Sequence, residues 1–344
     1  MTMRHGFVFI LAALVAIPAS AQSRVGTTAA PFLTLATGAR GASLGNAYTS
    51  IATGPDALFW NPGGIARPYR DSHRGGLFFS NNQWVAGIDY NAAAVTLPVM
   101  RKGVVGLSLA FVDYGDMDVR TVSQPEGTGE TFTANDLSVG VSYAMPLTDS
   151  FYFGGTTKLI RQSIRDMTAT TGAVDLGFVL VTKYVNGMTV AASIMNFGGK
   201  MQMDGINSEL TVDVDRQNSG SSESIPARIK MDSWDLPLSF KFGVAVPVVS
   251  LSDVTFTVLA DANQTNDNNL NADLGAQLEY KTNMLTFDAR MGYKDAGVDN
   301  VDSHFSYGSG LDVALSGVRF GFDFALVPFD LLGNTRMIDF RIYF

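Results

Sequence analysis

One segment of this sequence spaces oxygen-bearing side chains two residues apart, as a cation-binding loop would. Its alternate positions, from residue 261 to residue 273, are Asp261, Asn263, Thr265, Asp267, Asn269, Asn271 and Asp273. A calcium loop of the EF-hand type needs glycine at its sixth position and glutamate at its twelfth. Those positions hold Asn266 and Ala272. We therefore interpret the segment as a solvated hairpin loop, and we expect neither a metal nor a cofactor.

Nucleophilic catalysis has little support in the sequence. Cysteine is absent, and beyond the first 21 residues the histidines are His73 and His304. No serine stands in a nucleophile-elbow motif. We predict that the protein is not an enzyme. A Ser-His-acid hydrolase stays a minor alternative, because missing motifs are weak evidence across folds.

Charged side chains that alternate with apolar ones are the third group that could do chemistry. The group comprises Lys158, Asp175, Lys241, Asp288, Arg290, Asp312, Arg319, Asp323, Asp339 and Arg341, together with Asp261, Asp273 and Glu279. Such a group could line a transport pathway, but unpaired buried charge is costly. We therefore favour a paired network that fills an interior and that also includes Arg40 and Arg67.

These charges recur because much of the chain alternates apolar and polar residues. In residues 318–324, one face would hold Val318, Phe320, Phe322 and Phe324, and the other Arg319, Gly321 and Asp323. Successive side chains of a strand face opposite sides of its sheet. An apolar row facing lipid and a polar row facing a lumen are typical of an outer-membrane barrel.

The pattern predicts an all-β fold, namely a transmembrane antiparallel β-barrel of about 14 strands with an N-terminal plug. Beyond the N-terminal leader no apolar run is long enough for a membrane helix, so any membrane span must consist of strands. The predicted strands are residues 76–82, 89–99, 104–113, 135–145, 151–164, 172–184, 188–196, 236–246, 254–262, 271–280, 285–294, 305–315, 318–326 and 336–344.

The links between these strands support the same fold. Links after even-numbered strands are short, at 100–103, 146–150, 185–187, 281–284 and 316–317, with 247–253 somewhat longer. Most links after odd-numbered strands are long, at 114–134, 197–235, 263–270, 296–304 and 327–335. Outer-membrane barrels have short periplasmic turns and longer outer loops, and a soluble sandwich has no reason to sort its loops. An even number of strands then predicts both termini on the periplasmic side.

The two ends of the chain carry targeting and assembly signals. Arg4, an apolar run and an A-x-A site at residues 19–21 predict a signal peptide over residues 1–21. At the other end, Phe340, Tyr343 and Phe344 are interpreted as an assembly signal for the barrel assembly machinery. Because lipid tolerates no unpaired backbone edge, the last strand should pair with the first.

These signals predict three regions and a location. The regions are a signal peptide (1–21), a plug or hatch segment (22–75) and a barrel (76–344), and the barrel would lie in the bacterial outer membrane, in contact with its lipid. The formal net charge is −8 and no basic cluster is present, which argues against a nucleic-acid partner.

Residues 29–68 differ from the rest because they are rich in small residues and do not alternate. We expect Asp56 to cap a single helical turn that Asn61-Pro62 ends. We interpret the stretch as a compact plug inside the barrel, and an irregular soluble lead-in is the alternative.

Two motifs lie within this stretch. The first, from residue 38 to 48, includes Gly38, Arg40, Gly41 and Gly45, and the second, from residue 55 to 66, includes Asp56, Trp60, Asn61, Pro62 and Gly63. Together they resemble the PorV/PorQ family of FadL-like outer-membrane barrels, although Gly63 stands where that family usually has alanine. The resemblance continues through the strand pattern to Phe344, and it implies a lumen obstructed by an N-terminal hatch.

The resemblance also implies a function. PorV-like members assist type IX secretion, so protein secretion or surface assembly is expected here, with secretion-system subunits or secreted cargo as partners. FadL-like transporters pass hydrophobic ligands such as long-chain fatty acids through a lateral opening at a strand kink, for which Tyr114-Gly115-Asp116 is the candidate. Uptake of such ligands is the alternative function, and a structural envelope role is the third. Apolar residues within 197–235 suggest a protein contact or a ligand vestibule, or they pack on the barrel.

Deleting Phe344 is expected to impair assembly, because the terminal aromatic signal is lost. The measurement is the fraction of heat-modifiable, folded barrel in isolated outer membranes. Phe344→Trp keeps an aromatic end and should assemble normally. A normal folded fraction for the deletion would contradict the assignment.

Overall fold

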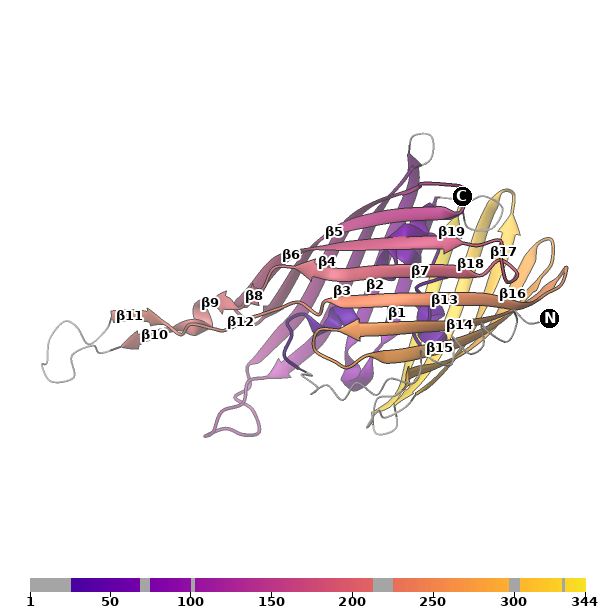
Figure 1. Ribbon diagram of the computed structural model, residues 1–344. Helices are drawn as coiled ribbons and strands as arrows, with labels where there is room; N and C mark the ends of the chain where they lie inside the picture. Colours follow the sequence, from indigo (N-terminus) through magenta and orange to yellow (C-terminus); the bar gives the residue numbers. More distant parts are fainter. Residues whose placement is uncertain (1–25, 69–74, 100–102, 213–224, 297–303, 330–331) are drawn as a thin grey trace, which may run out of the picture.

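The computed structural model describes residues 26–68, 75–99, 103–212, 225–296, 304–329 and 332–344, in which fourteen long strands dominate (Figure 1). These strands are β1 (Gly76–Gln83), β2 (Asp89–Val99), β3 (Gly103–Asp118), β4 (Thr131–Pro146), β5 (Phe151–Ile164), β6 (Met167–Val181), β7 (Thr189–Gly198), β13 (Ser239–Ser250), β14 (Val254–Thr265), β15 (Asn271–Lys281), β16 (Leu285–Ala296), β17 (Phe305–Leu315), β18 (Val318–Phe329) and β19 (Gly333–Tyr343).

Helical structure is confined to short pieces. These are η1 (Pro31–Thr34), α2 (Ala39–Ser43), η2 (Pro55–Phe59), η3 (Pro62–Ala66), η4 (Val85–Gly87) and η5 (Ile206–Ser208). Across the described residues, no helix is long and apolar enough to cross a membrane.

The sheet closes into a barrel because β1 pairs with both β2 and β19, and β5 pairs with β6. The closing pair runs antiparallel from Gly76 opposite Tyr343 to Gln83 opposite Arg336. Each of the fourteen long strands therefore has a neighbour on both sides. This arrangement confirms the predicted fold class and the predicted pairing of the last strand with the first.

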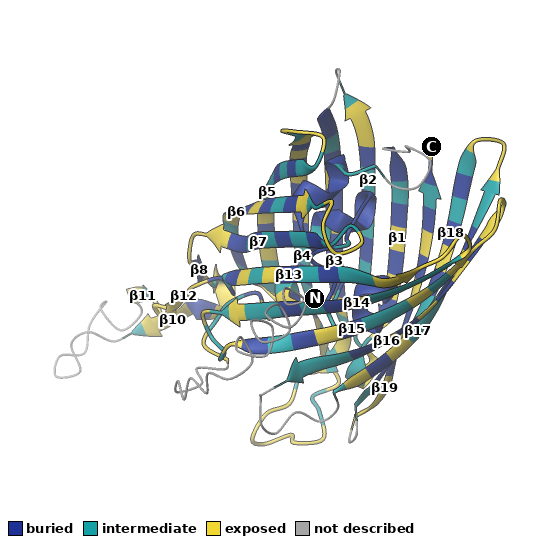
Figure 2. Cartoon of the chain, turned by 45° about the vertical axis from the view of Figure 1, so that its right-hand side comes forward, coloured by how far each residue is buried: buried dark blue, intermediate teal, exposed yellow. Residues whose placement is uncertain are grey.

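Burial alternates along the strands as the sequence predicts, which gives the banded colouring of Figure 2. In β18, Arg319 and Asp323 are buried inside the barrel, whereas Phe322 is 49% exposed on the outside. Phe340 of the neighbouring β19 faces outward in the same way, and Arg341 faces inward. The outer face is thus an apolar surface that suits lipid.

The strands extend further than the alternation predicts at the end of the barrel with the longer links. The link between β3 and β4 shrinks to residues 119–130, and β6 begins at Met167 rather than at residue 172. A two-residue turn, Arg165-Asp166, joins β5 to β6 where a longer link was expected. The outward residues beyond this point include Thr168 and Thr170, so the apolar row stops while the backbone pairing with β5 continues. Apolar alternation therefore reports the lipid-facing part of a strand and underestimates its length.

Residues 26–68, which we call the N-terminal segment, lie inside the barrel. At one end, Thr28 Oγ1 donates to Asp267 Oδ2, which lies in the link between β14 and β15. At the other end, ideal Cβ atoms on Gly54 and Gly76 would contact Tyr343 and Pro55 respectively, where β1 begins and β19 ends. Residues 26–28 therefore lie at the end of the barrel with the longer links, and the C-terminus lies at the end with the short turns. Which of these ends is periplasmic stays a prediction, and the N-terminus of the chain lies outside the described residues.

Residues 199–238, which we call the extension, link β7 to β13 and project well beyond the barrel rim (Figure 1). The sequence predicts a loop here, but the described part contains short strands, β8 (Met201–Gln202), β9 (Asp204–Gly205), β10 (Glu209–Val212), β11 (Ile225–Arg228) and β12 (Ser233–Trp234). β10 pairs with β11, and β8 pairs with β12. The extension is thus a ribbon and not an irregular loop.

Phe322→Arg should destabilise the membrane-inserted barrel by ~2–4 kcal/mol, because a guanidinium would face lipid near the middle of β18. Unfolding in denaturant from lipid vesicles measures this free energy. Leu315→Arg is the matched control, since Leu315 is also exposed on the outer surface but borders the Ser316-Gly317 turn. It should cost about 0–1 kcal/mol, and equal losses at both positions would refute the depth assignment.

Candidate functional site: the charged contact between the N-terminal segment and the wall

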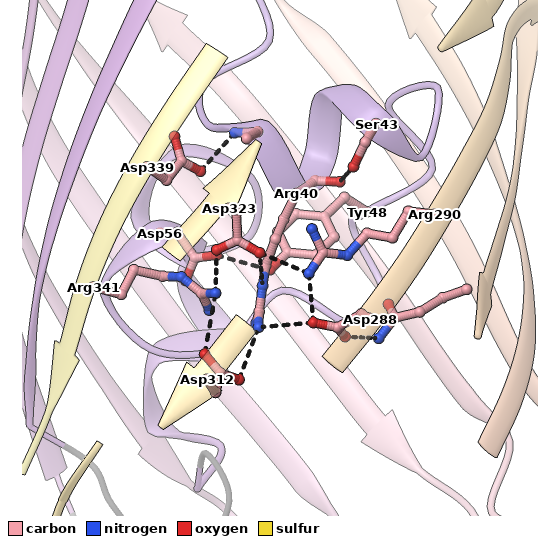
Figure 3. A network of polar contacts seen from close by, with 12 residues as sticks. Arg40, Ser43, Tyr48, Asp56, Asp288, Arg290, Asp312, Asp323, Asp339 and Arg341 are labelled. Atoms are coloured by element: carbon pink, nitrogen blue, oxygen red, sulfur yellow. Dashed lines mark hydrogen bonds and ion pairs between the residues drawn. The ribbon is translucent and has the colours of Figure 1, made fainter. Parts of the chain in front are cut away.

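Four adjacent strands, β16 to β19, present a cluster of charges to the helix α2 (Figure 3). Arg40 of α2 places its Nε 3.3 Å from Asp323 Oδ1 and its Nη2 3.3 Å from Asp312 Oδ2. Its Nη2 also lies 3.9 Å from Asp288 Oδ2. One arginine of the N-terminal segment therefore contacts carboxylates from three different strands.

Two arginines of the wall complete the cluster. Arg290 Nη2 donates to Asp288 Oδ2 at 2.8 Å and to Asp323 Oδ1 at 2.7 Å. Arg341 pairs with Asp323 and lies 3.4 Å from Asp312. Three guanidinium groups thus face three carboxylates, and all six residues are buried. Balanced charge is what a buried network requires, because an uncompensated ion in a low-dielectric interior is strongly unfavourable.

Glycines in the wall make room for this network. A Cβ atom at Gly310 would overlap Arg290 and Asp323, and a Cβ atom at Gly321 would lie 2.5 Å from Asp312 Oδ1. Even serine at Gly321 would therefore disturb the charges. These two glycines are part of the site although neither carries a functional group.

Hydrogen bonds extend the contact on both sides of Arg40. The backbone N–H of Ala39 donates to Asp339 Oδ2 at 2.6 Å. Asp56, fully enclosed in the N-terminal segment, accepts a 2.7 Å bond from Tyr48 Oη and makes no capping bond. The prediction that Asp56 caps a helical turn is therefore wrong, because its carboxylate turns inward toward the tyrosine. Burial raises the pKa of Asp56, and the nearby charges of Arg341 and Arg40 act in the opposite direction.

The Trp-Asn-Pro motif docks the segment against the opposite wall. Asn61, which is fully buried, donates from Nδ2 to the carbonyl oxygen of Phe178 at 3.0 Å and accepts from Gly63 N–H at 3.0 Å. Its side chain and Pro62 lie so close to Gly177 that a Cβ atom there would overlap both. One asparagine side chain thereby bonds to the backbone of β6 and stabilises the turn of its own segment.

Trp60 links the two motifs within the segment. Its Nε1 donates to the carbonyl oxygen of Thr37 at 2.8 Å, and its ring meets Tyr48 edge to face. A Cβ atom at Gly41 would overlap the indole ring. Lys241 Nζ lies over the ring, 4.8 Å from its centroid, which is a cation–π geometry. Glycine at position 41 is therefore required by the tryptophan that follows 19 residues later.

A second polar cluster lies away from the first, at the foot of the extension. Lys158 Nζ is 2.9 Å from Asp175 Oδ2 and donates to Asn196 Oδ1 at 2.5 Å. Asp175 accepts from Asn196 N–H, and Asn196 Nδ2 donates to the carbonyl oxygen of Pro237. The pairing of β6 with β7 shifts register here, between Val174 and Leu176. This cluster therefore fixes both ends of the extension to the wall.

The end of the lumen beside the longer links holds a cavity of about 530 Å³ between the N-terminal segment and β14, β15, β16, β18 and β19. Leu35, Val327 and Phe329 line one part of it, and Asn263 and Asn271 line another. The cavity is therefore both apolar and polar.

The oxygen-rich loop borders this cavity but is used for hydrogen bonding. Asp267 binds Thr28, Asn271 Nδ2 donates to Asp295 Oδ1, and Asp273 accepts from Asp295 N–H. In the part of the chain that the structure describes, no group of three or more His, Cys, Asp or Glu side chains could hold a metal ion.

The charged residues predicted to face the lumen lie at buried or half-buried positions of their strands, and they form separate groups. The group around Arg40 consists of Asp288, Arg290, Asp312, Asp323 and Arg341. Lys158 pairs with Asp175 in the second cluster. Arg319 is also buried. Of the predicted assembly signal, Phe340 and Phe344 face outward, whereas Tyr343 is buried and accepts from Arg341 Nη1.

Other contacts have no counterpart in the sequence prediction. Gln162 Oε1 accepts from Ala30 N–H, Ser306 Oγ from Gly45 N–H, and Asp261 Oδ2 from Thr49 N–H. In each case a wall side chain holds a backbone N–H of the N-terminal segment. The alternation predicts that Gln162, Ser306 and Asp261 face inward, but nothing in the sequence indicates which backbone N–H each of them binds.

The sequence family described as "Type IX secretion system protein PorV" matches residues 18–251 of this chain. No curated protein matches the sequence.

Several solved structures are similar to this chain at low sequence identity. The Pseudomonas putida toluene transporter TodX has a TM-score of 0.55 at 12% identity, over 88% of this chain and 96% of that one. The CymD monoaromatic hydrocarbon channel has a TM-score of 0.55 at 12% identity, over 89% and 96%. A Pseudomonas aeruginosa FadL homologue has a TM-score of 0.53 at 12% identity, over 89% and 97%. At this identity the similarity establishes the fold alone.

Arg40→Met should lower the free energy of unfolding by about 3–5 kcal/mol, because it removes one partner of a buried charge network while keeping an apolar stem. Denaturant unfolding in detergent measures the loss. The matched control is Arg120→Met, since Arg120 pairs with Asp118 at 3.7 Å with both side chains more than half exposed. That variant should lose no more than ~1 kcal/mol. A similarly small loss at Arg40 would mean that the network does not stabilise the fold.

Proposed function

Because the chain belongs to the PorV family, we propose that it assists protein secretion or surface assembly of the type IX kind, as a non-enzymatic barrel of the bacterial outer membrane. The match over residues 18–251 carries this proposal, since it covers both N-terminal motifs and the strands from β1 to β13. It confirms the resemblance seen in the sequence.

The filled lumen supports this function over an open channel. The N-terminal segment contacts the wall through the Arg40 network on β16 to β19 and through Asn61 on β6. We propose that residues 22–75 act as a permanent plug, with the barrel from residue 76 as its frame. A barrel obstructed in this way is suited to holding partners at its rim.

The extension is the surface we propose for those partners. It projects beyond the rim, and Ile206 and Ile229 are 67% and 56% exposed. Phe197 and Trp234 at its base are also exposed. Apolar side chains exposed on a projecting ribbon are typical of a protein contact. Secretion-system subunits or secreted cargo are the proposed occupants.

Uptake of hydrophobic small molecules is the second candidate, and the cavity of about 530 Å³ at the end of the lumen beside the longer links favours it. The predicted kink is present as a register shift in the β3–β4 pairing between Asp113 and Asp116. Pairing resumes at Asp116, however, so β3 stays joined to β4 on both sides of the shift. Saturable fatty-acid binding that Arg40→Met weakens would favour uptake. If the protein neither binds fatty acid nor co-purifies with secretion-system subunits or cargo, a structural envelope role is favoured.

Replacing Ile206 and Ile229 together with asparagine should reduce co-purification of secretion-system subunits at least about tenfold, because two apolar contacts are lost. The measurement is quantitative mass spectrometry of pull-downs from solubilised outer membranes. Leu251→Asn is the matched control, since Leu251 is 66% exposed in the turn between β13 and β14 at the other end of the barrel. Unchanged co-purification by the double variant, with a folded barrel, would contradict the role of the extension.

A further inference from the structure

The lipid-facing surface has a groove of about 460 Å³ across β19, β1, β2 and β3. Two rows of outward residues border it, as the strand register shows. One row is Ile338, Asn81, Asn91 and Phe111, and the row below it is Phe340, Phe79, Ala93 and Leu109. The groove exists because Ala93 is small while its neighbours in the row are large.

The floor of the groove contains a polar pair. Asn81 Nδ2 donates to Asn91 Oδ1 at 2.8 Å across the β1–β2 pairing. This bond uses one donor and one acceptor of the pair. Each asparagine amide has further capacity, so whichever way the amides are oriented, an acceptor and donors remain beyond this single bond. A polar pair on an otherwise apolar outer face therefore offers hydrogen bonds to whatever occupies the groove.

The depth of the pair within the membrane follows from the register. The next outward row toward the longer links, at the predicted extracellular rim, is Arg336, Gln83, Asp89 and Asp113, which are all polar and exposed. The next row in the other direction is Ile342, Leu77, Val95 and Leu107, which are all apolar. Two residues of a tilted strand separate adjacent rows, so the pair lies roughly 5 Å below the polar rim.

That depth selects the chemistry of the occupant. Directly below the head group of a lipid lie the carbonyl groups of its acyl chains and, where the chains are hydroxylated near the carbonyl, their hydroxyl groups. The rest of each chain is hydrocarbon. A group of this kind would lie level with Asn81 and Asn91, while the chain beyond it would lie on Ala93 between Phe79 and Leu109. We infer that the groove binds one acyl chain of an outer-leaflet lipid that bears a carbonyl or hydroxyl group near its head.

Native mass spectrometry of the full-length protein, after an extended detergent wash, tests this inference. Wild-type protein should retain one lipid, and Ala93→Phe should reduce the retained fraction at least about tenfold by filling the groove. Ala289→Phe is the matched control, because Ala289 is an outward alanine of β16 away from the groove. It should retain lipid like the wild type, and equal retention by Ala93→Phe and wild type would overturn the inference.

A second variant removes the polar pair while it keeps side chains with the same branching. Asn81→Leu/Asn91→Leu should still fold, since it makes a lipid-facing row wholly apolar. Reconstitution into phosphatidylethanolamine vesicles doped with a lipid that bears 3-hydroxyacyl chains then shows which group is recognised. If the asparagine pair recognises the hydroxyl group, the wild type should enrich the hydroxylated lipid. If the pair recognises the carbonyl group, the wild type should retain both lipids. In either case the double variant should lose retention of lipid.

A protein occupant is the competing outcome. If Ala93→Phe removes a second copy of the chain or a co-purifying membrane protein and leaves lipid retention unchanged, the groove is a protein contact and the lipid assignment is wrong. Heat modifiability of each variant establishes that the barrel is folded before the comparison is made.

Discussion

The structure depends on one constraint, that no backbone hydrogen-bonding group can remain unpaired in hydrocarbon. Fourteen strands satisfy it by closing a circle through the β1–β19 pair. Closure also creates an interior that is wider than side chains from the wall can span, and large barrels commonly leave such an interior to water. In this protein the N-terminal segment occupies it and makes polar contacts with the inner face.

Polar groups hold the N-terminal segment, because the alternation along each strand places polar side chains on the inner face of the barrel. Arg40 meets carboxylates from three strands, and Asn61 satisfies a backbone carbonyl of β6. Charged residues inside a membrane barrel are expensive unless each has a partner. In this protein the same ion pairs that make the interior tolerable also join the segment to the wall. Stability and obstruction of the lumen are therefore properties of one set of contacts.

Alternation of side chains was enough to predict the strand count, the closing pair and the inward direction of residues such as Asp323 and Arg341. It could not predict that Arg40 pairs with Asp312 and Asp323, since nothing along the chain relates positions so far apart. It also missed the start of β6, because the outward threonines there carry no apolar signal. Gly41 and Gly321 look like flexible positions in the sequence, but each is small because Trp60 or a charged pair occupies the space.

The direction of the N-terminal segment has a consequence for biogenesis. The segment is synthesised first, yet Arg40 is held by β16, β17 and β18, and Ala39 by β19, which leave the ribosome last. The contacts of Arg40 and Ala39 with the wall can therefore form only after these last strands have been made. Docking of the N-terminal segment against β16 to β19 is in this sense a late step in the maturation of the protein.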